Sequence, residues 1–226
     1  MTSSSKRLIY VKTPKTGGTS ILSILKSHFP NHTHIAARHK NWPSYEDLLR
    51  SDLIIVGEAI AKTFRRKYTS IWHESRSFAV VRNPYEKTIS AWQYISNLRE
   101  HELELVLTKY LPSRSIFRKY ESDYVKRNHD YIHLVAPQTC WITNSKDTLI
   151  VDDLLRFEHL QAYWNSFVSS SSHNLSSLPV LNRTYYKNKF SISPKSVKLM
   201  RARFASDFKL LGYPTTPTPY ITSLIK

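Results

Sequence analysis

Cysteine is almost absent from this sequence, which has a single one, Cys140, among its 226 residues. One cysteine permits no internal disulfide, so nothing in the sequence requires an oxidising compartment. Trp141 and the apolar residues nearby predict a buried, inert thiol instead of a nucleophile. The ten histidines are scattered and show no spacing typical of metal ligands, so we expect no metal site.

Long apolar runs and a signal-peptide pattern are missing as well. No stretch approaches the roughly 20 apolar residues that cross a bilayer. The N-terminal Met-Thr-Ser-Ser-Ser-Lys-Arg leads straight into a strand pattern instead of an apolar signal core. We therefore expect a cytoplasmic protein with no membrane span.

Acidic residues are scarce: 17 Asp and Glu stand against 33 Lys and Arg, which gives a formal net charge of +16. Such an excess predicts attraction to an anionic partner. Nucleic acid, an acidic glycan, a membrane surface and a phosphorylated cofactor all fit that charge, so motifs must choose among them.

Short apolar strand patterns alternate with helical ones along the chain. Strands are expected at 8–11, 53–56 and 78–81, with one or two short ones within 149–157. Helices are expected at 19–29, 44–49, 84 to about 110, 114–128, 158–168 and 194–208. The alternation predicts an α/β fold with a mainly parallel central sheet and helices on both faces. The length suits one domain, 1–226, with a mobile serine-rich loop at 169–177, too polar to pack a core, and a proline-rich tail at 213–226.

Residues 7–20 combine a short strand, a glycine turn and a helix start. The first N–H groups of a helix have no intrahelical partner and lie at the positive end of its dipole, so this arrangement suits an anion. Lys15 would add a charge, and Thr16, Thr19 and Ser20 three hydroxyls, around the pair Gly17 and Gly18. The same residue types also occur in ordinary turns and helix caps. The lysine precedes the glycines, unlike in the Gly-x-x-x-x-Gly-Lys-Ser/Thr loop, which argues against a Mg-dependent nucleoside triphosphate site.

A second candidate anion site is the stretch 78–90. Arg82 follows a buried strand, Pro84 begins a helix, and Ser90 lies further along that helix. Ligands of α/β sheets bind beyond the carboxyl ends of strands, which is where Arg82 is expected. We expect Arg82 and Ser90 to share a phosphate, whereas an ion pair of Arg82 with Glu86 would by itself explain the arginine equally well.

Together the two stretches resemble the sulfotransferases that use 3′-phosphoadenosine 5′-phosphosulfate (PAPS). The loop Lys15-Thr16-Gly17-Gly18-Thr19-Ser20 is similar to that family's 5′-phosphosulfate loop, and Arg82 with Ser90 is similar to its 3′-phosphate site. The carbohydrate branch, which includes the heparan sulfate 2-O-sulfotransferases, shows further similarity at Pro137-Gln138, 154–160, 182–184 and 207–213.

The resemblance implies a P-loop-kinase-like sulfotransferase fold, PAPS as cofactor and 3′,5′-adenosine bisphosphate as product. It implies an acceptor hydroxyl on an anionic or neutral glycan, with a small molecule or a protein as the alternative, and no nucleic-acid partner. The Golgi relatives carry a membrane anchor that this chain lacks, so the resemblance is compatible with a cytoplasmic enzyme or a trimmed Golgi-type one.

The resemblance also assigns roles to single residues. Lys15 would stabilise charge on the bridging oxygen as the 5′-phosphate leaves. Glu58 stands where many carbohydrate sulfotransferases carry histidine, and because other members use glutamate, Glu58 is the expected general base, with His73 as runner-up. A structural ion pair of Glu58 with Lys15 or Arg82 is the alternative.

The segment 181–189 is similar to the family's lid over the nucleotide. In it, Arg183 and Thr184 would add to the 3′-phosphate site or close over the adenine.

Two other functions stay open on the sequence alone. A P-loop-type nucleotide kinase would need Mg²⁺ and an aspartate at a strand end, whereas the strand at 53–56 leads into Gly57-Glu58. A basic nucleic-acid-binding protein would interleave aromatic residues with Lys and Arg on one face. Neither explains the combination of the loop with Arg82 and Ser90.

Overall fold

The computed structural model describes residues 6–36, 42–57, 61–94, 103–110, 136–179 and 191–225. The chain divides into two compact units. Unit 1 comprises Met1–Val81 and Trp141–Arg183, and unit 2 comprises Arg82–Cys140 and Thr184–Lys226. The expected single domain over the whole chain stays a prediction.

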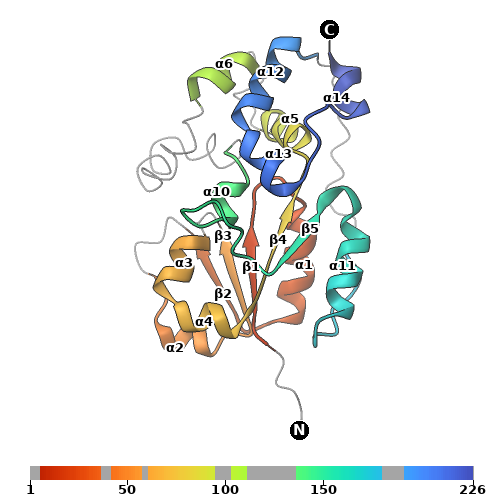
Figure 1. Ribbon diagram of the computed structural model, residues 1–226. Helices are drawn as coiled ribbons and strands as arrows, with labels where there is room; N and C mark the ends of the chain where they lie inside the picture. The colour runs from red at the N-terminus through yellow and green to blue at the C-terminus, as the bar shows by residue number, and fades with distance from the viewer. Residues whose placement is uncertain are drawn as a thin grey trace. The chain divides into compact units, whose positions relative to one another are not determined.

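Unit 1 is built on a five-stranded sheet (Figure 1). Its strands are β1 (Leu8–Lys12), β2 (His32–Ala36), β3 (Leu53–Gly57), β4 (Arg76–Val81) and β5 (Asp153–Arg156). They lie in the order β2-β3-β1-β4-β5, and every neighbouring pair is parallel. Parallel neighbours need crossover connections, which the intervening segments supply. The predicted α/β class with a parallel central sheet is confirmed, whereas β2 was not predicted.

Helices flank this sheet. They are α1 (Gly18–His28), α2 (Tyr45–Leu49), α3 (Ala61–Lys67), α4 (Thr69–Glu74), α10 (Thr139–Ile142), which begins in unit 2, and α11 (Leu160–Ser169), preceded by a 3₁₀ turn at Phe157–His159. Figure 1 shows α1 and α11 on one side of the strands and α3 and α4 on the other. A capping box begins α2: the hydroxyl of Ser44 accepts from the N–H of Asp47, whose carboxylate accepts from the N–H of Ser44.

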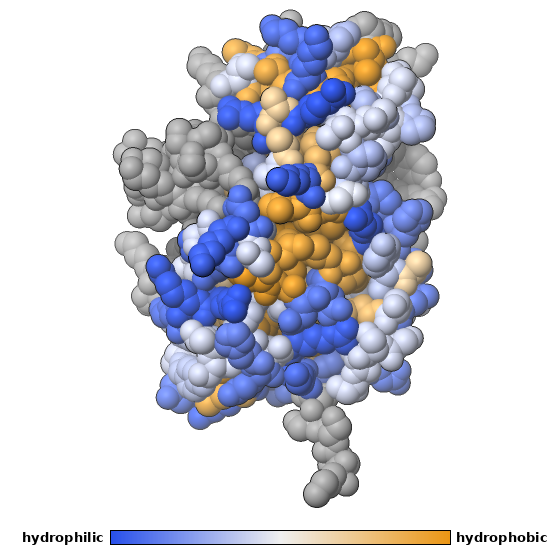
Figure 2. Space-filling view, viewed as in Figure 1, coloured by the Kyte–Doolittle hydropathy of each residue, from blue (hydrophilic) through white to orange (hydrophobic). Residues whose placement is uncertain are grey.

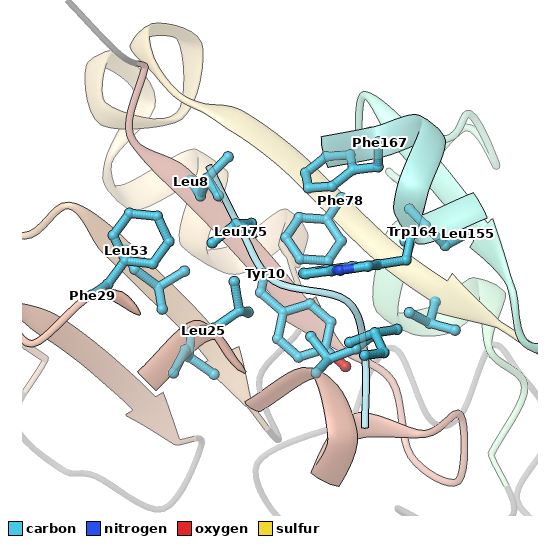
Figure 3. Close-up of a cluster of buried hydrophobic side chains, with 14 residues drawn as sticks. Leu8, Tyr10, Leu25, Phe29, Leu53, Phe78, Leu155, Trp164, Phe167 and Leu175 are labelled. Atoms are coloured by element: carbon cyan, nitrogen blue, oxygen red, sulfur yellow. The ribbon is translucent and has the colours of Figure 1, made fainter. Parts of the chain in front are cut away.

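The core of unit 1 explains why the strands are apolar throughout. On one sheet face, side chains such as Tyr10 and Phe78 pack against α1 and α11, and the two rings stack with their centroids 4.9 Å apart (Figure 3). The alternate residues Ile9, Val11 and Ile54 are also fully buried. Because successive strand residues point to opposite faces, both faces of the sheet are covered. In the space-filling view, hydrophilic residues border a broad hydrophobic patch near the middle of the face shown (Figure 2).

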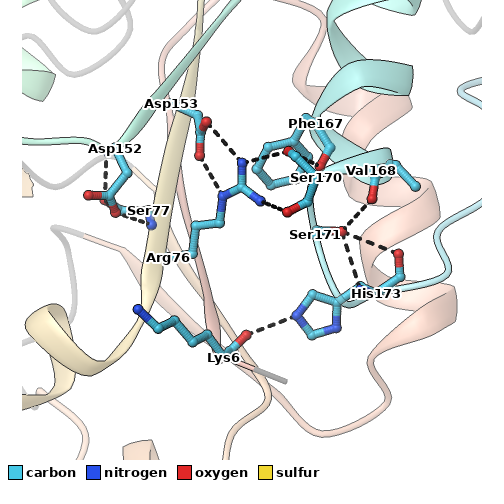
Figure 4. A network of polar contacts seen from close by, with 10 residues as sticks. All are labelled: Lys6, Arg76, Ser77, Asp152, Asp153, Phe167, Val168, Ser170, Ser171 and His173. Atoms are coloured by element: carbon cyan, nitrogen blue, oxygen red, sulfur yellow. Dashed lines mark hydrogen bonds and ion pairs between the residues drawn. The ribbon is translucent and has the colours of Figure 1, made fainter. Parts of the chain in front are cut away.

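A polar clamp joins β4, β5 and α11 (Figure 4). The guanidinium of Arg76 donates to both carboxylate oxygens of Asp153, at 2.7 and 3.0 Å, and to the carbonyl of Ser170 at 2.9 Å. It also lies 4.6 Å from the ring centroid of Phe167. Bidentate geometry is the favourable form of this ion pair. The clamp therefore fixes the last strand and the helix that follows it.

The serine-rich segment after α11 does contribute to the core. Leu175 is only 6% exposed and belongs to the cluster of Figure 3. The indole of Trp164 donates to the carbonyl of Ser176 at 2.9 Å. The prediction that 169–177 is too polar to pack a core is wrong at this leucine, because one apolar side chain anchors the segment while the serines stay near the surface.

The regular elements among the described residues of unit 2 are helices. They are α5 (Pro84–Tyr94), α6 (Leu103–Leu105) with the π-helical turn Val106–Tyr110, α12 (Pro194–Arg203), α13 (Ala205–Leu211) and α14 (Pro219–Leu224). The predicted helix at 194–208 is in fact two helices, because the backbone leaves the helical conformation at Phe204. The proline-rich tail contains α14, which begins at Pro219 and is capped by Thr218. The helix expected at 114–128 lies outside the described residues.

The described residues include neither a membrane-spanning helix nor a cluster of metal ligands. None of their helices has both the length and the apolar character that a membrane crossing needs. Nor does that part of the chain gather three or more His, Cys, Asp or Glu side chains into a group that could hold a metal ion.

Candidate functional site

The predicted anion loop lies at the carboxyl end of β1 and leads directly into α1. Two threonines fix its shape from inside. The buried Thr13 donates its hydroxyl to the carbonyl of Val80 on β4, and the buried Thr16 donates to the carbonyl of Thr13 at 2.8 Å. The Thr16 hydroxyl, one of the three expected around an anion, is thus engaged inside the loop.

Two residues of the loop have a left-handed backbone. Lys15 has φ 62° and Gly17 has φ 81°. This region is disfavoured for residues with a Cβ, so its occupancy by Lys15 requires the surrounding structure to hold it there. Gly17 is also closely packed, since a Cβ on it would lie 3.1 Å from side-chain atoms of Phe157 and Leu160. Phe157 and Leu160, which follow β5, therefore pack directly against the loop at Gly17.

The positive end of α1 faces no carboxylate from its own first turn, which contains no acidic residue. Gly17 caps the helix without a side-chain hydrogen bond. Within the described part of the chain, the main-chain N–H groups of Gly18 and Thr19 have no acceptor. Ser20 is buried, and Thr19 is exposed. Unpaired N–H groups at the start of a helix are the donors that phosphate and sulfate oxygens use.

A second lysine accompanies the loop. Lys12 is the last residue of β1, and a Cβ on Gly18 would lie 3.3 Å from its Cε and 3.4 Å from the hydroxyl of Tyr10. Burial raises the pKa of that tyrosine, so its hydroxyl stays neutral. Lys12 was not among the predicted site residues. The sequence pattern that could have pointed to Lys12 is a cation at the carboxyl end of an apolar strand.

The two glycines of the loop should respond differently to substitution. Gly17→Ala puts a Cβ on a left-handed residue and against Phe157 and Leu160, and we expect it to lower the free energy of unfolding by about 1–2 kcal/mol. Gly18→Ala is the matched control, because Gly18 is helical and faces the flexible end of Lys12. Urea unfolding of both variants measures the difference. Equal losses of stability in the two variants would show that neither the left-handed backbone of Gly17 nor its close packing requires glycine at this position.

This loop lies at the point of the sheet where the strand connections begin to lead to opposite sides. The connection that leaves β1 leads to β2 on one side, and the one that leaves β4 leads to β5 on the other. Ligands of open α/β sheets bind at such a switch point, beyond the carboxyl ends of the strands. β1 and β4 are direct neighbours, and the hydrogen bond from Thr13 to Val80 joins the loop to the end of β4.

Arg82 is the residue that follows β4, and it belongs to unit 2 together with Ser90. Asn83 caps α5, accepting from the N–H of Tyr85 at 3.0 Å, so Pro84 is the first helical residue, as predicted. Arg82 and Glu86 form an ion pair at 3.6 Å, the alternative that the sequence left open. Their side chains are 12% and 20% exposed. Ser90 is buried on α5. The combination of these residues with the loop of unit 1 stays a prediction.

The structure does not bring His73 to the loop. His73 is exposed on α4, just before the amino end of β4. The loop follows the carboxyl end of the parallel neighbour β1, and five residues of strand span about 16 Å. His73 therefore lies at the opposite edge of the sheet, which disfavours it as a base for chemistry at the loop.

A different histidine lies near the carboxyl edge. A Cβ on Gly57, the last residue of β3, would come within 2.5 Å of Nε2 of His34, which projects from β2. A Cβ at this position would require the ring to shift. Gly57 is in register with Lys12, so the imidazole approaches the edge that carries the loop. Glu58, Arg183 and Thr184 lie outside the described residues.

Comparisons with known proteins do not identify the function of this chain. No family model and no curated protein matches the chain. A solved structure that resembles it is that of a fungal RNA kinase, which is 15% identical with a TM-score of 0.32, over 98% of this chain and 95% of that one. So low a TM-score carries no argument about what this chain does.

Proposed function

We propose that this protein is a PAPS-dependent sulfotransferase that moves a sulfuryl group from PAPS to an acceptor hydroxyl on a saccharide. The observation that carries the proposal is the loop at the switch point of the sheet, with Lys15 in a left-handed conformation beside two unpaired N–H groups of α1. Its second support is the likeness of this loop and of Arg82 with Ser90 to the two phosphate sites of that enzyme family.

The residues present suit an anionic cofactor. The N–H groups of Gly18 and Thr19 would hold oxygens of the 5′-phosphosulfate, and Lys15 would supply a positive charge beside the bond that breaks. Hydrogen bonds to charged groups contribute about 1.5–3 kcal/mol each, so a few of them suffice for tight binding. Arg82 and Ser90 would hold the 3′-phosphate, and Arg183 and Thr184 would complete that site.

The chemistry is an in-line displacement. The acceptor oxygen forms a bond to sulfur while the bond from sulfur to the bridging oxygen of the 5′-phosphate breaks. Lys15 neutralises the charge that collects on that bridging oxygen. Glu58, which follows Gly57 in the chain, would take the proton of the acceptor hydroxyl. His34, packed on Gly57, is better placed than His73 to assist it.

The net charge of +16 favours an anionic glycan as the acceptor. The phosphosulfate cofactor needs only a handful of these cations. The remaining excess would raise the local concentration of a polyanionic chain and would make its binding dependent on salt.

Ligand-induced thermal stabilisation tests the proposed function. At about 100 times the dissociation constant, 3′,5′-adenosine bisphosphate should add about 2.7 kcal/mol of stability, which corresponds to a rise in Tm of about 5–10 °C for a chain of this size. The control ligands are 5′-AMP, which lacks the 3′-phosphate, and ATP with Mg²⁺. A rise with ATP and Mg²⁺ alone would contradict the sulfotransferase and favour the kinase.

A further inference from the structure

The main chain of Arg82 is held by a side chain from a distant part of the sequence. The ladder between β4 and β5 ends at Val81, so the next N–H and C=O groups have no strand partner from it. The side-chain amide of Gln138 replaces that partner. Its Oε1 accepts from the N–H of Arg82 at 2.8 Å, and its Nε2 donates to the carbonyl of Arg82 at 2.7 Å. A primary amide carries an NH2 donor group and a carbonyl acceptor side by side, so it can pair with a main-chain N–H and C=O as a strand neighbour would.

Gln138 is in turn fixed by a buried carboxylate on α13. Asp207 accepts from the N–H of Gln138 at 2.7 Å, from the N–H of Thr139 at 2.9 Å and from the hydroxyl of Thr139 at 2.7 Å. Gln138, Thr139 and Asp207 are all 0% exposed. From the other side, the Nζ of the buried Lys87 donates to the carbonyl of Ala136 at 2.7 Å. The turn that carries Gln138 is therefore held from both α5 and α13.

This network is a costly way to fill a core. Buried polar groups destabilise a fold unless each is satisfied, and apolar residues of similar volume often stabilise it more. A satisfied network does give one fixed geometry. Here the network fixes the main chain of a single residue, Arg82, which directly follows β4.

We propose that Gln138 is a positioning residue for Arg82, with Asp207 holding Gln138 in place, and that this relay sets the affinity for the 3′-phosphate of the nucleotide. The inference deepens the proposed function and rests on it for the identity of the ligand. Gln138 does not touch the ligand in this scheme, because both polar groups of its side chain are taken by the main chain of Arg82. Its effect on binding passes through the arginine.

The first measurement tests the positioning itself, whatever the ligand. In the full chain, Gln138→Met keeps the length of the side chain and removes both hydrogen bonds to Arg82. NMR-detected amide hydrogen exchange of Arg82 should then accelerate about tenfold or more, since its N–H loses its acceptor. Gln138→Glu, a second variant, keeps an acceptor for that N–H but no donor for the carbonyl, and should accelerate exchange less. Unchanged exchange of Arg82 in Gln138→Met would overturn the inference.

The second measurement tests the consequence for binding, by calorimetry with 3′,5′-adenosine bisphosphate and with 5′-AMP. Gln138→Met should weaken the bisphosphate about tenfold to a hundredfold and leave 5′-AMP within about twofold, because a displaced Arg82 matters only to the 3′-phosphate. An equal loss for both nucleotides would reduce Gln138 to a structural residue and overturn the inference.

Thr88→Val is the matched control. Thr88 is buried on α5, and its hydroxyl donates to the carbonyl of Pro84 in the same helix. This variant should lose stability but keep the preference for the bisphosphate. A wild-type protein that shows no preference for the bisphosphate would contradict the proposed function, while faster exchange at Arg82 would still establish the role of Gln138 in holding it.

Discussion

Replacing Lys15 with methionine is expected to lower kcat for sulfuryl transfer by about a hundredfold to a thousandfold. In the proposed mechanism, the charge of Lys15 acts on the bridging oxygen mainly in the transition state, when that oxygen becomes negative. Methionine is similar in length and keeps the same left-handed backbone requirement, so the loop should retain its shape. The dissociation constant of 3′,5′-adenosine bisphosphate should rise much less than kcat falls. Turnover with PAPS and calorimetry with the bisphosphate measure the two effects.

Two further variants make this expectation specific. Lys15→Arg keeps the charge and should retain more activity than Lys15→Met. Lys26→Met removes an exposed charge from the other end of α1 and should leave both kcat and binding within about twofold. If Lys15→Met turned over within twofold of the wild type, Lys15 would have no part in the chemistry, and Lys12 beside Gly18 would take its place as the candidate.

The free energy of unfolding should rise with pH between about 8 and 10 because of Lys87. Burial lowers the pKa of this lysine from 10.5 to about 8, against the opposing effects of Asp207 and Cys140. Between these two values the unfolded chain binds the proton more tightly than the folded one, so raising the pH favours the folded state. Relative to Lys87→Met, the wild type should gain about 2 kcal/mol between pH 7 and pH 9.5. Urea unfolding of both proteins at the two pH values measures this gain.

The comparison with Lys87→Met cancels the titration of the other groups, which both proteins share. Lys198→Met is the surface control: this lysine is exposed on α12, and the variant should keep the pH dependence of the wild type. A parallel pH dependence in the wild type and Lys87→Met would show that Lys87 stays charged in the folded protein.

Much of the sheet could be predicted because its signals are local. A continuous apolar run such as Leu53–Gly57 is buried on both faces and needs no partner to be recognised. Ser44 with Asp47, and Pro84 at the start of α5, are capping signals contained within four residues. Strand β2 was missed because His32–Ala36 contains two histidines and lies at the edge of the sheet, where polar residues are tolerated.

Only part of the candidate site could be predicted from the sequence. The loop from Lys15 to Ser20 was found because glycines and a lysine at the start of a helix form a local pattern. His73 was correctly expected just before β4, but that position is at the sheet edge opposite the loop, which disfavours the runner-up role proposed for it. The Thr16 hydroxyl was assigned to the ligand, although it bonds to Thr13 three residues earlier.

The sequence by itself determined the class of the fold, the position of the anion loop and the candidate residues Arg82 and Ser90, since each depends on neighbours within a few positions. Tertiary structure alone decided that Thr13 ties the loop to β4, that His34 occupies the space above Gly57, and that Gln138 and Asp207 hold the main chain of Arg82. Those contacts join residues that are 23 to 69 positions apart. Such pairs are selected by the packing of whole elements, and no local propensity or periodicity encodes them.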